Sequence, residues 1–324
     1  MKSLIALLSL CSVATMADYS SHEMADEFAQ SMAEEHGFDK KAVLAVLSKA
    51  ERQQSILDAM SRPAEKTKQW FEYRDIFVQP SRIEQGVAFW QEHKATITRA
   101  SEKYGVAPEV IVAIIGVETR YGRHAGSYRV IDALTTLGFD YPSRGKFFRK
   151  ELAHYLLMTQ EQEQDPLLLK GSYAGAMGYG QFIPSSYRAY AVDFDGDNKV
   201  DIWQNPVDAI GSVANYFRAH RWQTGEPVFA RARIAKKHDE SVLNSKARPE
   251  FSLSELKKKG YTPVDEGFAS TLKAVPLTYV GDHGTEFWLG FDNFYVITRY
   301  NRSHMYAKAV WLLGREIKAQ MEKS

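Results

Sequence analysis

The stretch Pro108-Glu-Val-Ile-Val-Ala-Ile-Ile-Gly-Val-Glu-Thr119 decides the fold. Proline is well tolerated in the first turn of a helix, and the residues from 110 to 117 are apolar on every face. A helix that is apolar all round has to be surrounded by other parts of the protein. We therefore predict a fully buried central helix, ended by Gly122 and Gly126.

Glu118 is the exception in this apolar stretch. Burial disfavours an ionised carboxylate, and the C-terminal end of a helix carries partial negative charge, so both effects should raise the pKa of Glu118. A carboxylic acid that stays protonated in an apolar setting can serve as the general acid for cleavage of a glycosidic bond. The alternative is a structural salt bridge between Glu118 and a nearby base such as Arg120 or Arg123.

The regions on both sides of the central helix indicate a mainly helical α+β protein. Residues 18–104 have helical periodicity, with Gly37 placed to close one helix and Asp39 to cap the next. Residues 226–265 are polar, and aromatic and β-branched runs predict short strands at Leu272 to Val280 and Phe294 to Thr298. We predict a small α/β subdomain over 226–298 and a last helix from Ser303 to Lys323 that returns to the helical body.

The composition excludes several classes of protein. The chain has 324 residues, 44% of them hydrophobic, and a formal net charge of +1, which is typical of a globular protein that buries a core. One Cys excludes a disulfide framework. Because the net charge is close to zero, no long-range field favours a nucleic acid or an anionic membrane, and we predict no nucleic-acid partner.

Residues 1–17 are interpreted as a signal peptide. Lys2 forms a short positive region, Leu4 to Val13 an apolar one, and Thr15-Met16-Ala17 a cleavage site of small residues. The segment is too short to span a membrane. Outer-membrane attachment would require a lipid on Cys11, and the bulky Leu10 before it disfavours that alternative.

A glycine-rich loop follows the central helix in the sequence, Gly171-Ser-Tyr-Ala-Gly-Ala-Met-Gly-Tyr-Gly180, and continues as Gln-Phe-Ile-Pro-Ser-Ser-Tyr187. Together with the Glu118 motif it resembles the lytic transglycosylases of the lysozyme-like superfamily, and most of all the lytic murein transglycosylase B family. The resemblance also covers Trp70 to Arg74, Pro206 to Phe217 and Ile297 to Asn301. It implies a lysozyme-like catalytic core over 105–225, with an N-terminal helical region at 18–104, the subdomain at 226–298 and a C-terminal helix at 299–324.

The resemblance also implies roles for individual residues. Glu118 corresponds to the family's single catalytic acid/base, and Ser172 and Gln181 to residues that hydrogen-bond the sugar. The aromatic lining corresponds to Tyr73, Tyr216, Tyr300 and Tyr306, each of which could instead be a core tyrosine. Where the family offers two adjacent arginines to the peptide stem, this chain has Ser143 followed by Arg144.

The implied function is a periplasmic peptidoglycan lytic transglycosylase. Such an enzyme cleaves the β-1,4 bond between N-acetylmuramic acid and N-acetylglucosamine without water and leaves a 1,6-anhydromuramyl end. Two alternatives stay open: a muramidase that admits water, and a non-catalytic murein-binding scaffold stabilised by calcium in which Glu118 is only structural.

An aspartate-rich loop predicts a structural calcium site. Asp193, Asp195, Asp197 and Asp201 occupy positions one, three, five and nine, as in an EF-hand loop. Asn198 stands at position six, where Gly is usual, and is acceptable because Asn tolerates left-handed geometry. Gln204 at position twelve cannot supply a carboxylate. We predict ligands from Asp193, Asp195, Asp197, the Lys199 carbonyl and, as the family implies, Asp208.

Overall fold

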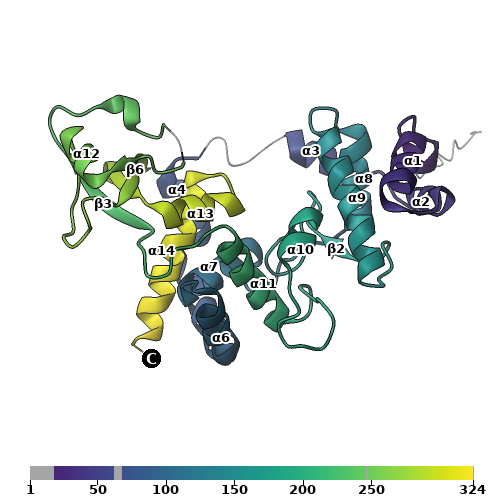
Figure 1. Cartoon of the computed structure of the whole chain (residues 1–324), viewed down its shortest axis with the longest axis horizontal. Helices are drawn as coiled ribbons and strands as arrows, with labels where there is room; N and C mark the ends of the chain where they lie inside the picture. Colours follow the sequence, from purple (N-terminus) through teal and green to yellow (C-terminus); the bar gives the residue numbers. More distant parts are fainter. Residues whose placement is uncertain (1–17, 62–67, 246, 324) are drawn as a thin grey trace, which may run out of the picture.

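The computed structural model describes residues 18–61, 68–245 and 247–323 and has the predicted mainly helical α+β architecture (Figure 1). The signal peptide and Cys11 lie outside these residues. Among the helices described, none is both long and apolar enough to cross a membrane.

The helices form two lobes (Figure 1). The first lobe joins the N-terminal helices to a helix pair from the middle of the chain, and consists of η1 (Tyr19–Ser21), α1 (Ala25–His36), α2 (Lys40–Leu47), α3 (Gln54–Ser61), α8 (Val130–Asp140) and α9 (Gly145–Glu161). Gly37 has a positive φ of 72° and closes α1, and the Asp39 side chain caps α2, which confirms both predicted boundaries.

The second lobe surrounds the central helix. Its helices are α4 (Trp70–Phe77), α5 (Pro80–Glu92), α6 (Lys94–Tyr104), α7 (Pro108–Thr119), α11 (Pro206–Ala219), α13 (Asp292–Tyr300) and α14 (His304–Met321). Helix α10 (Pro184–Tyr190) contacts both α9 and α11, and the short antiparallel pair β1 (Tyr128–Arg129) and β2 (Lys170–Gly171) lies between the lobes. Residues 18–104 are thus divided between the two lobes.

Helix α7 is the centre of the second lobe, as predicted. Every residue from Val110 to Val117 is buried, and α5, α6, α11 and α14 all pack on it. Helix α14 approaches α7 closely at Gly314, where a Cβ atom would stand 2.8 Å from the carbonyl oxygen of Glu109. A larger residue there would push the two helices apart.

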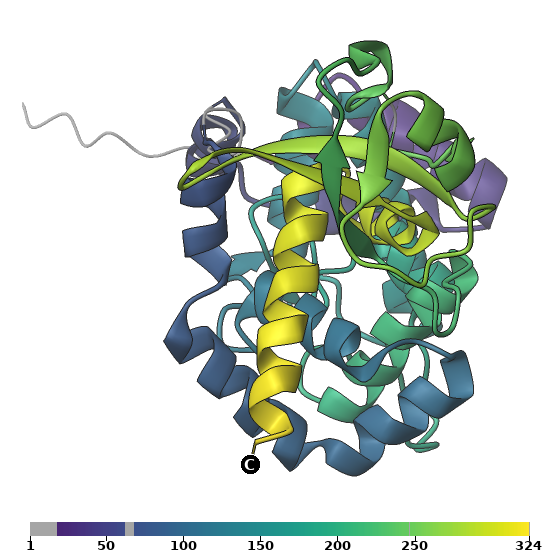
Figure 2. The same ribbon diagram turned by 90° about the vertical axis from the view of Figure 1, so that its left-hand side faces the viewer.

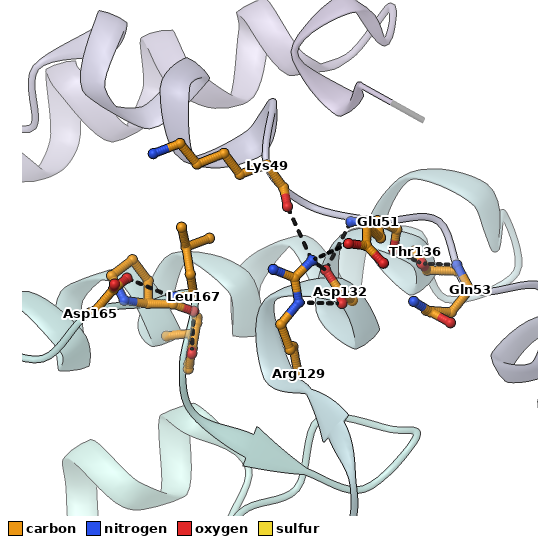
Figure 3. A network of polar contacts seen from close by, with 10 residues as sticks. Lys49, Glu51, Gln53, Arg129, Asp132, Thr136, Asp165 and Leu167 are labelled. Atoms are coloured by element: carbon orange, nitrogen blue, oxygen red, sulfur yellow. Dashed lines mark hydrogen bonds and ion pairs between the residues drawn. The ribbon is translucent and has the colours of Figure 1, made fainter. Parts of the chain in front are cut away.

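A polar network fastens the N-terminal segment to α8 (Figure 3). The Arg129 guanidinium donates to both carboxylate oxygens of Asp132, at 2.7 and 2.8 Å, and to the carbonyl of Lys49 at 3.1 Å. The amide of Glu51 donates to Asp132 at 2.8 Å, and that of Gln53 to the Thr136 hydroxyl at 3.0 Å. Because Asp132 is buried, these donors satisfy a carboxylate that would otherwise be costly to bury.

The subdomain is an antiparallel sheet of five strands in the order β4-β6-β7-β3-β5. Its elements are β3 (Phe229–Ile234), η3 (Glu240–Val242), β4 (Phe251–Ser252), α12 (Leu253–Lys258), β5 (Tyr261–Pro263), β6 (Lys273–Gly281) and β7 (Gly284–Gly290). The longest pairing, β6 with β7, sets Leu277 opposite Trp288. Figure 2 shows the strands crossing near one end of α14, whose C-terminal end points away from the sheet.

The strand predicted from Phe294 to Thr298 is wrong, because these residues lie in helix α13. The segment is rich in aromatic and β-branched residues, which favour strands only weakly. Phe294, Ile297 and Thr298 fall on one buried helical face, and α13 packs on α14 and β7. Tertiary burial of this face outweighs the strand propensity.

Lys308 connects α14 to α4 and the sheet from inside the protein. Its side chain is 2% exposed, and its ammonium lies 2.9 Å from Oε2 of Glu286. The ring centres of Trp70, Tyr279 and Trp288 lie 4.4, 4.0 and 4.4 Å from that ammonium. Burial lowers the pKa of Lys308 from its ordinary value of 10.5 to about 8, although Glu286 opposes the shift.

The contribution of Lys308 to the unfolding free energy should therefore change with pH. Between pH 8 and 10.5 Lys308 is neutral in the folded protein and charged in the unfolded chain. Because the unfolded state then binds more protons, the unfolding free energy rises with pH in this range. We expect the unfolding free energy of the natural protein, minus that of Lys308→Met, to increase by about 2–3 kcal/mol from pH 7 to pH 10. Urea denaturation followed by circular dichroism measures this difference.

Lys318→Met is the matched control, because Lys318 lies on the same helix with its side chain 49% exposed. The difference in unfolding free energy between the natural protein and Lys318→Met should change little with pH. If the difference for Lys308→Met is equally independent of pH, the lowered pKa of Lys308 is contradicted.

Candidate active site

Glu118 lies at the end of α7, half-buried, and is contacted by a tyrosine from α14. The hydroxyl of Tyr306 donates a short hydrogen bond to Oε1 of Glu118. Tyr306 is 3% exposed, and burial together with the Glu118 charge raises the pKa of its phenol far above the ordinary value. The phenol therefore keeps its proton and is the donor in this pair.

Two backbone carbonyls of the glycine-rich loop connect this loop to the helices around Glu118. The hydroxyl of Thr119 donates to the carbonyl of Tyr179 at 2.9 Å and accepts the amide of Gly122 at 2.9 Å. The hydroxyl of Tyr300, at the end of α13, donates to the carbonyl of Gly180 at 2.5 Å. Three segments that are distant in sequence are thus held together beside Glu118.

Several residues other than glycine adopt left-handed backbone conformations near Glu118. Arg120 and Tyr121 directly follow the end of α7 with φ of 52° and 61°, and Gln181 has φ of 50°. Such conformations cost on the order of 1 kcal/mol each and gather at functional sites. Gln181 is held by hydrogen bonds from its Nε2 to the carbonyls of Gly178 and Ala125, at 3.0 and 3.2 Å.

The guanidinium of Arg120, which the sequence left open as a partner of Glu118, donates to side chains of α5. Its Nε donates to Gln85 at 2.8 Å and its Nη2 to the Ser81 hydroxyl at 3.3 Å. These contacts direct the guanidinium toward α5.

Ser172 shapes the start of the glycine-rich loop. Its amide donates to the carbonyl of Ala176 at 2.8 Å, and its hydroxyl oxygen accepts the Ala176 amide at 3.1 Å. The hydroxyl proton is not used in that bond, so it can be offered to a ligand. The predicted sugar contact of Ser172 is compatible with this arrangement and stays a prediction.

Of the tyrosines predicted to line the site, Tyr216 and Tyr300 pack against each other. Tyr216 is 6% exposed, donates its hydroxyl to the carbonyl of Arg299 at 2.6 Å, and meets the ring of Tyr300 edge-on with centroids 4.6 Å apart. Tyr73 is 1% exposed and lies close enough to Tyr306 to interact with it electrostatically. These contacts give Tyr73 and Tyr216 a packing role, and their contact with substrate stays a prediction.

Arg144 stands apart from this group. It precedes α9 in the first lobe, is exposed, and lies over the rings of Phe147 and Phe148 at 4.5 and 5.1 Å. Ser143 beside it is also exposed. The guanidinium is therefore accessible to a ligand, and its predicted contact with a peptide stem is untested.

The aspartate-rich loop brings three carboxylates together. One oxygen each from Asp193, Asp195 and Asp197 lies within 4.8 Å of the others. Asn198 has the left-handed φ of 69° that position six requires, as predicted from its tolerance of this geometry. Although partial desolvation opposes it, donation from the amides of Gly196 and Asn198 lowers the pKa of Asp193, which keeps this carboxylate ionised.

Asp208 organises this loop from α11. Its two carboxylate oxygens accept the amides of Phe194 and Asp201, at 2.7 and 2.8 Å, and its side chain is fully buried. Burial raises the pKa of Asp208 against these two donors, and Asp195 and Asp193 add to the rise. Asp208 is not one of the three carboxylates that converge within 4.8 Å, so its role as a ligand stays a prediction. Lys199 donates its amide to Asp197 at 2.8 Å, and the role of its carbonyl stays a prediction.

Comparisons with known proteins identify the family of the chain. The family model described as the transglycosylase SLT domain matches residues 20–315. The membrane-bound lytic murein transglycosylase B of Escherichia coli is 44% identical over 309 residues, which are 93% of this chain and 84% of that protein. The chain has the fold of a lytic murein transglycosylase, and it is such an enzyme, a lyase that acts on peptidoglycan. The chain belongs to the transglycosylase SLT domain family.

Solved structures extend this similarity. The catenated lytic transglycosylase SltB1 of Pseudomonas aeruginosa is 53% identical, with a TM-score of 0.90 over 94% of this chain and all of that one. Slt35 of Escherichia coli, solved with calcium, is 42% identical, with a TM-score of 0.84 over 94% of this chain and 96% of that one. SltB3 of Pseudomonas aeruginosa, solved with NAG-NAM-pentapeptide, is 33% identical, with a TM-score of 0.80 over 91% of this chain and 78% of that one.

Sequence reasoning missed Thr119 as a residue of the site. Its buried hydroxyl joins the end of α7 to the glycine-rich loop, so it positions Glu118 relative to that loop. The available signal was a hydroxyl residue directly after the carboxylate at the end of an apolar helix. Tyr179 gave no signal, because only its backbone carbonyl takes part.

Tyr300→Phe should loosen the glycine-rich loop. The change removes the donor to the Gly180 carbonyl while keeping the ring that packs on Tyr216. We expect a loss of about 1–2 kcal/mol in unfolding free energy, because a buried acceptor is left without its partner. Hydrogen exchange should become faster at the amides of residues 178–182. Tyr173→Phe, at an exposed position in the same loop, is the control and should leave both measurements unchanged. Unchanged exchange in Tyr300→Phe would show that other contacts hold the loop.

Proposed function

We propose that Glu118 is the single acid/base of this lytic transglycosylase. The observation that carries the proposal is the half-buried carboxylate at the end of α7, held by a protonated Tyr306. A group in this position can change its protonation state during a reaction without changing its place. The raised pKa of Glu118 itself stays a prediction from the sequence.

The proposed reaction cleaves the β-1,4 bond between N-acetylmuramic acid and N-acetylglucosamine. Protonated Glu118 gives its proton to the glycosidic oxygen, which leaves with the bonding electron pair. The resulting carboxylate then takes the proton of the muramyl C6 hydroxyl, whose oxygen forms a new bond to C1. The product is a 1,6-anhydromuramyl end, Glu118 recovers its proton, and no water is consumed.

Substrate binding is proposed for the residues around Glu118. Ser172 and Gln181 lie on the loop that hydrogen bonds hold beside α7, which supports a role in orienting the sugar. Tyr300 and Tyr306 place phenol groups near the carboxylate. Tyr73, Tyr216 and Arg144 complete the proposed set. Since SltB3 was solved with NAG-NAM-pentapeptide, glycan strands with peptide stems are the proposed partner.

The periplasm is the proposed location. The signal peptide predicted at residues 1–17 and the action on murein both support it, and the Escherichia coli relative is membrane-bound by name.

A structural calcium ion is proposed for the aspartate-rich loop. The convergence of three carboxylates within 4.8 Å fits a hard divalent cation, which prefers oxygen ligands. Asp193, Asp195, Asp197, the Lys199 carbonyl and Asp208 are the proposed ligands. Slt35, which shares the fold, was solved with calcium.

Glu118→Gln should abolish turnover while the fold persists. Glutamine keeps the shape of the side chain but cannot give and take a proton, so release of muropeptides from purified sacculi should fall by about 10²–10⁴-fold. Mass spectrometry of the released sugars should find 1,6-anhydromuramyl ends with the natural protein. Glu109→Gln, on the same helix, is the control and should keep the activity. Reducing muramyl ends would instead make the enzyme a hydrolase, and full activity of Glu118→Gln would exclude its role.

Calcium should raise the thermal stability of the protein. Ligand bound only to the folded state adds about 2.7 kcal/mol when its concentration is 100 times Kd. We expect Tm to rise when calcium replaces EDTA, and the rise to disappear in Asp197→Asn. Asp165→Asn, a surface aspartate in the first lobe, is the control and should keep it. A rise that survives in Asp197→Asn would place the ion elsewhere.

A further inference from the structure

A basic pocket lies at the C-terminal end of α11, on the side of the second lobe where α13 ends. It has a volume of about 490 Å³, within the range of small-ligand sites. Three arginines, Arg221, Arg248 and Arg299, line it together with a single carboxylate, Asp292. Tyr295 gives it an aromatic wall. The three arginines and Asp292 together give the pocket a net charge of +2.

The three arginines have no carboxylate partner in the part of the chain that the structure describes. Arg74, Arg129 and Arg188 elsewhere in the chain each lie within 4.0 Å of a carboxylate oxygen. What distinguishes the pocket is that three arginines without an ion pair among the described residues line one cavity. Guanidinium groups bind carboxylates and phosphates through paired hydrogen bonds.

The backbone of the pocket is fixed in place. Asn293 of α13 is fully buried, accepts the amide of Gln223 at 2.8 Å, and donates to the carbonyls of Gln223 and Glu226 at 2.8 and 2.9 Å. The Gln223 side chain in turn donates to the carbonyl of Arg221 at 2.9 Å. The segment that carries Arg221 is therefore tied to the helix that carries Arg299, which prepares the pocket for a ligand.

Arg221 occupies a backbone position that favours glycine. It follows α11 with a φ of 68°, where the amides of Arg221 and Trp222 close the end of the helix. Helices commonly end with glycine in this conformation. Glycine would adopt this conformation without strain, so the backbone should tolerate Arg221→Gly.

Packed aromatic side chains connect the pocket to Tyr300 of the candidate active site. Arg299 directly precedes Tyr300, and its carbonyl accepts the hydroxyl of Tyr216 at 2.6 Å. His220, which also lines the pocket, stacks on Tyr216 with ring centroids 4.0 Å apart. Burial lowers the pKa of His220, and the charge of Arg299 adds to this shift, so Arg299 lies near the imidazole. Two rings, those of His220 and Tyr216, thus link the pocket to Tyr300.

We propose that this pocket binds a peptide stem of peptidoglycan through its carboxylates. The three arginines suit the carboxylates, Asp292 suits an ammonium group of the same peptide, and Tyr295 offers an apolar surface to its side chains. A phosphodiester from another wall polymer would carry the negative charge but would leave Asp292 unmatched. The proposal rests on the proposed function only in that the ligand belongs to the proposed substrate.

Direct binding of a soluble stem tetrapeptide tests the pocket without any cleavage. Isothermal titration of the full chain should show binding that weakens as NaCl rises from 50 to 500 mM. Arg299→Gln and Arg221→Gly should each weaken it by about fivefold or more, because each removes a charge-assisted contact. Arg221→Gly should keep or raise Tm, because glycine relieves the left-handed strain. Glu163→Gly, which relieves similar strain at a φ of 51° in the first lobe, should leave peptide binding unchanged.

Activity separates the pocket from the catalytic site. With peptide-bearing sacculi Arg221→Gly should raise KM and leave kcat unchanged, and with glycan chains stripped of peptide it should behave like the natural protein. Peptide binding that ignores both arginine substitutions would overturn the proposal, as would an absence of binding. Inorganic phosphate that binds where the peptide does not would overturn the peptide assignment. If the natural protein fails to cleave sacculi, the proposed function fails while the titration still decides the pocket.

Discussion

The apolar surface of α7 is the constraint on which the second lobe depends. A helix without a polar face gains nothing by contact with water on any side, so α5, α6, α11 and α14 have to enclose it. The enclosure also determines where Glu118 is. A carboxylate at the last turn of such a helix stands at the border between a packed core and the loops that follow, where only a few groups can reach it.

Hydrogen bonds to two backbone carbonyls of the glycine-rich loop hold the site together. Thr119 and Tyr300 come from helices that pack in the core, and each donates its hydroxyl to a neighbouring carbonyl of the glycine-rich loop. A loop that is rich in glycine loses much conformational entropy when it is ordered. The hydrogen bonds to two consecutive residues of the loop, from side chains on packed helices, offset part of this entropy loss. Ser172 and Gln181 stand on either side of these attachments.

The sequence was informative where local chemistry determines local structure. The apolar run of α7, the end of α1 at Gly37, the cap at Asp39 and the left-handed Asn198 were all predictable from the residues themselves. It misled at Phe294 to Thr298, where burial against α14 and β7 decides for a helix. The pairing of α1–α3 with α8 and α9 was also not predictable, because it joins segments separated by about 80 residues through groups such as Asp132 and Thr136.

The near-neutral charge of the whole chain limits how it can recognise an anionic wall. With 41 basic and 40 acidic residues, the protein has no net field that would draw it toward carboxylates over distances beyond a Debye length. Attraction then has to come from positive groups that have no carboxylate of their own nearby. Most of the described arginines that form ion pairs serve to join elements of the fold, as Arg129 joins the N-terminal segment to α8. Arg144, in the first lobe, and the arginines of the basic pocket, in the second, are among the described arginines that form no ion pair. They stand on different lobes, so contacts with them would act over short distances at two separate places, as a protein without a long-range field requires.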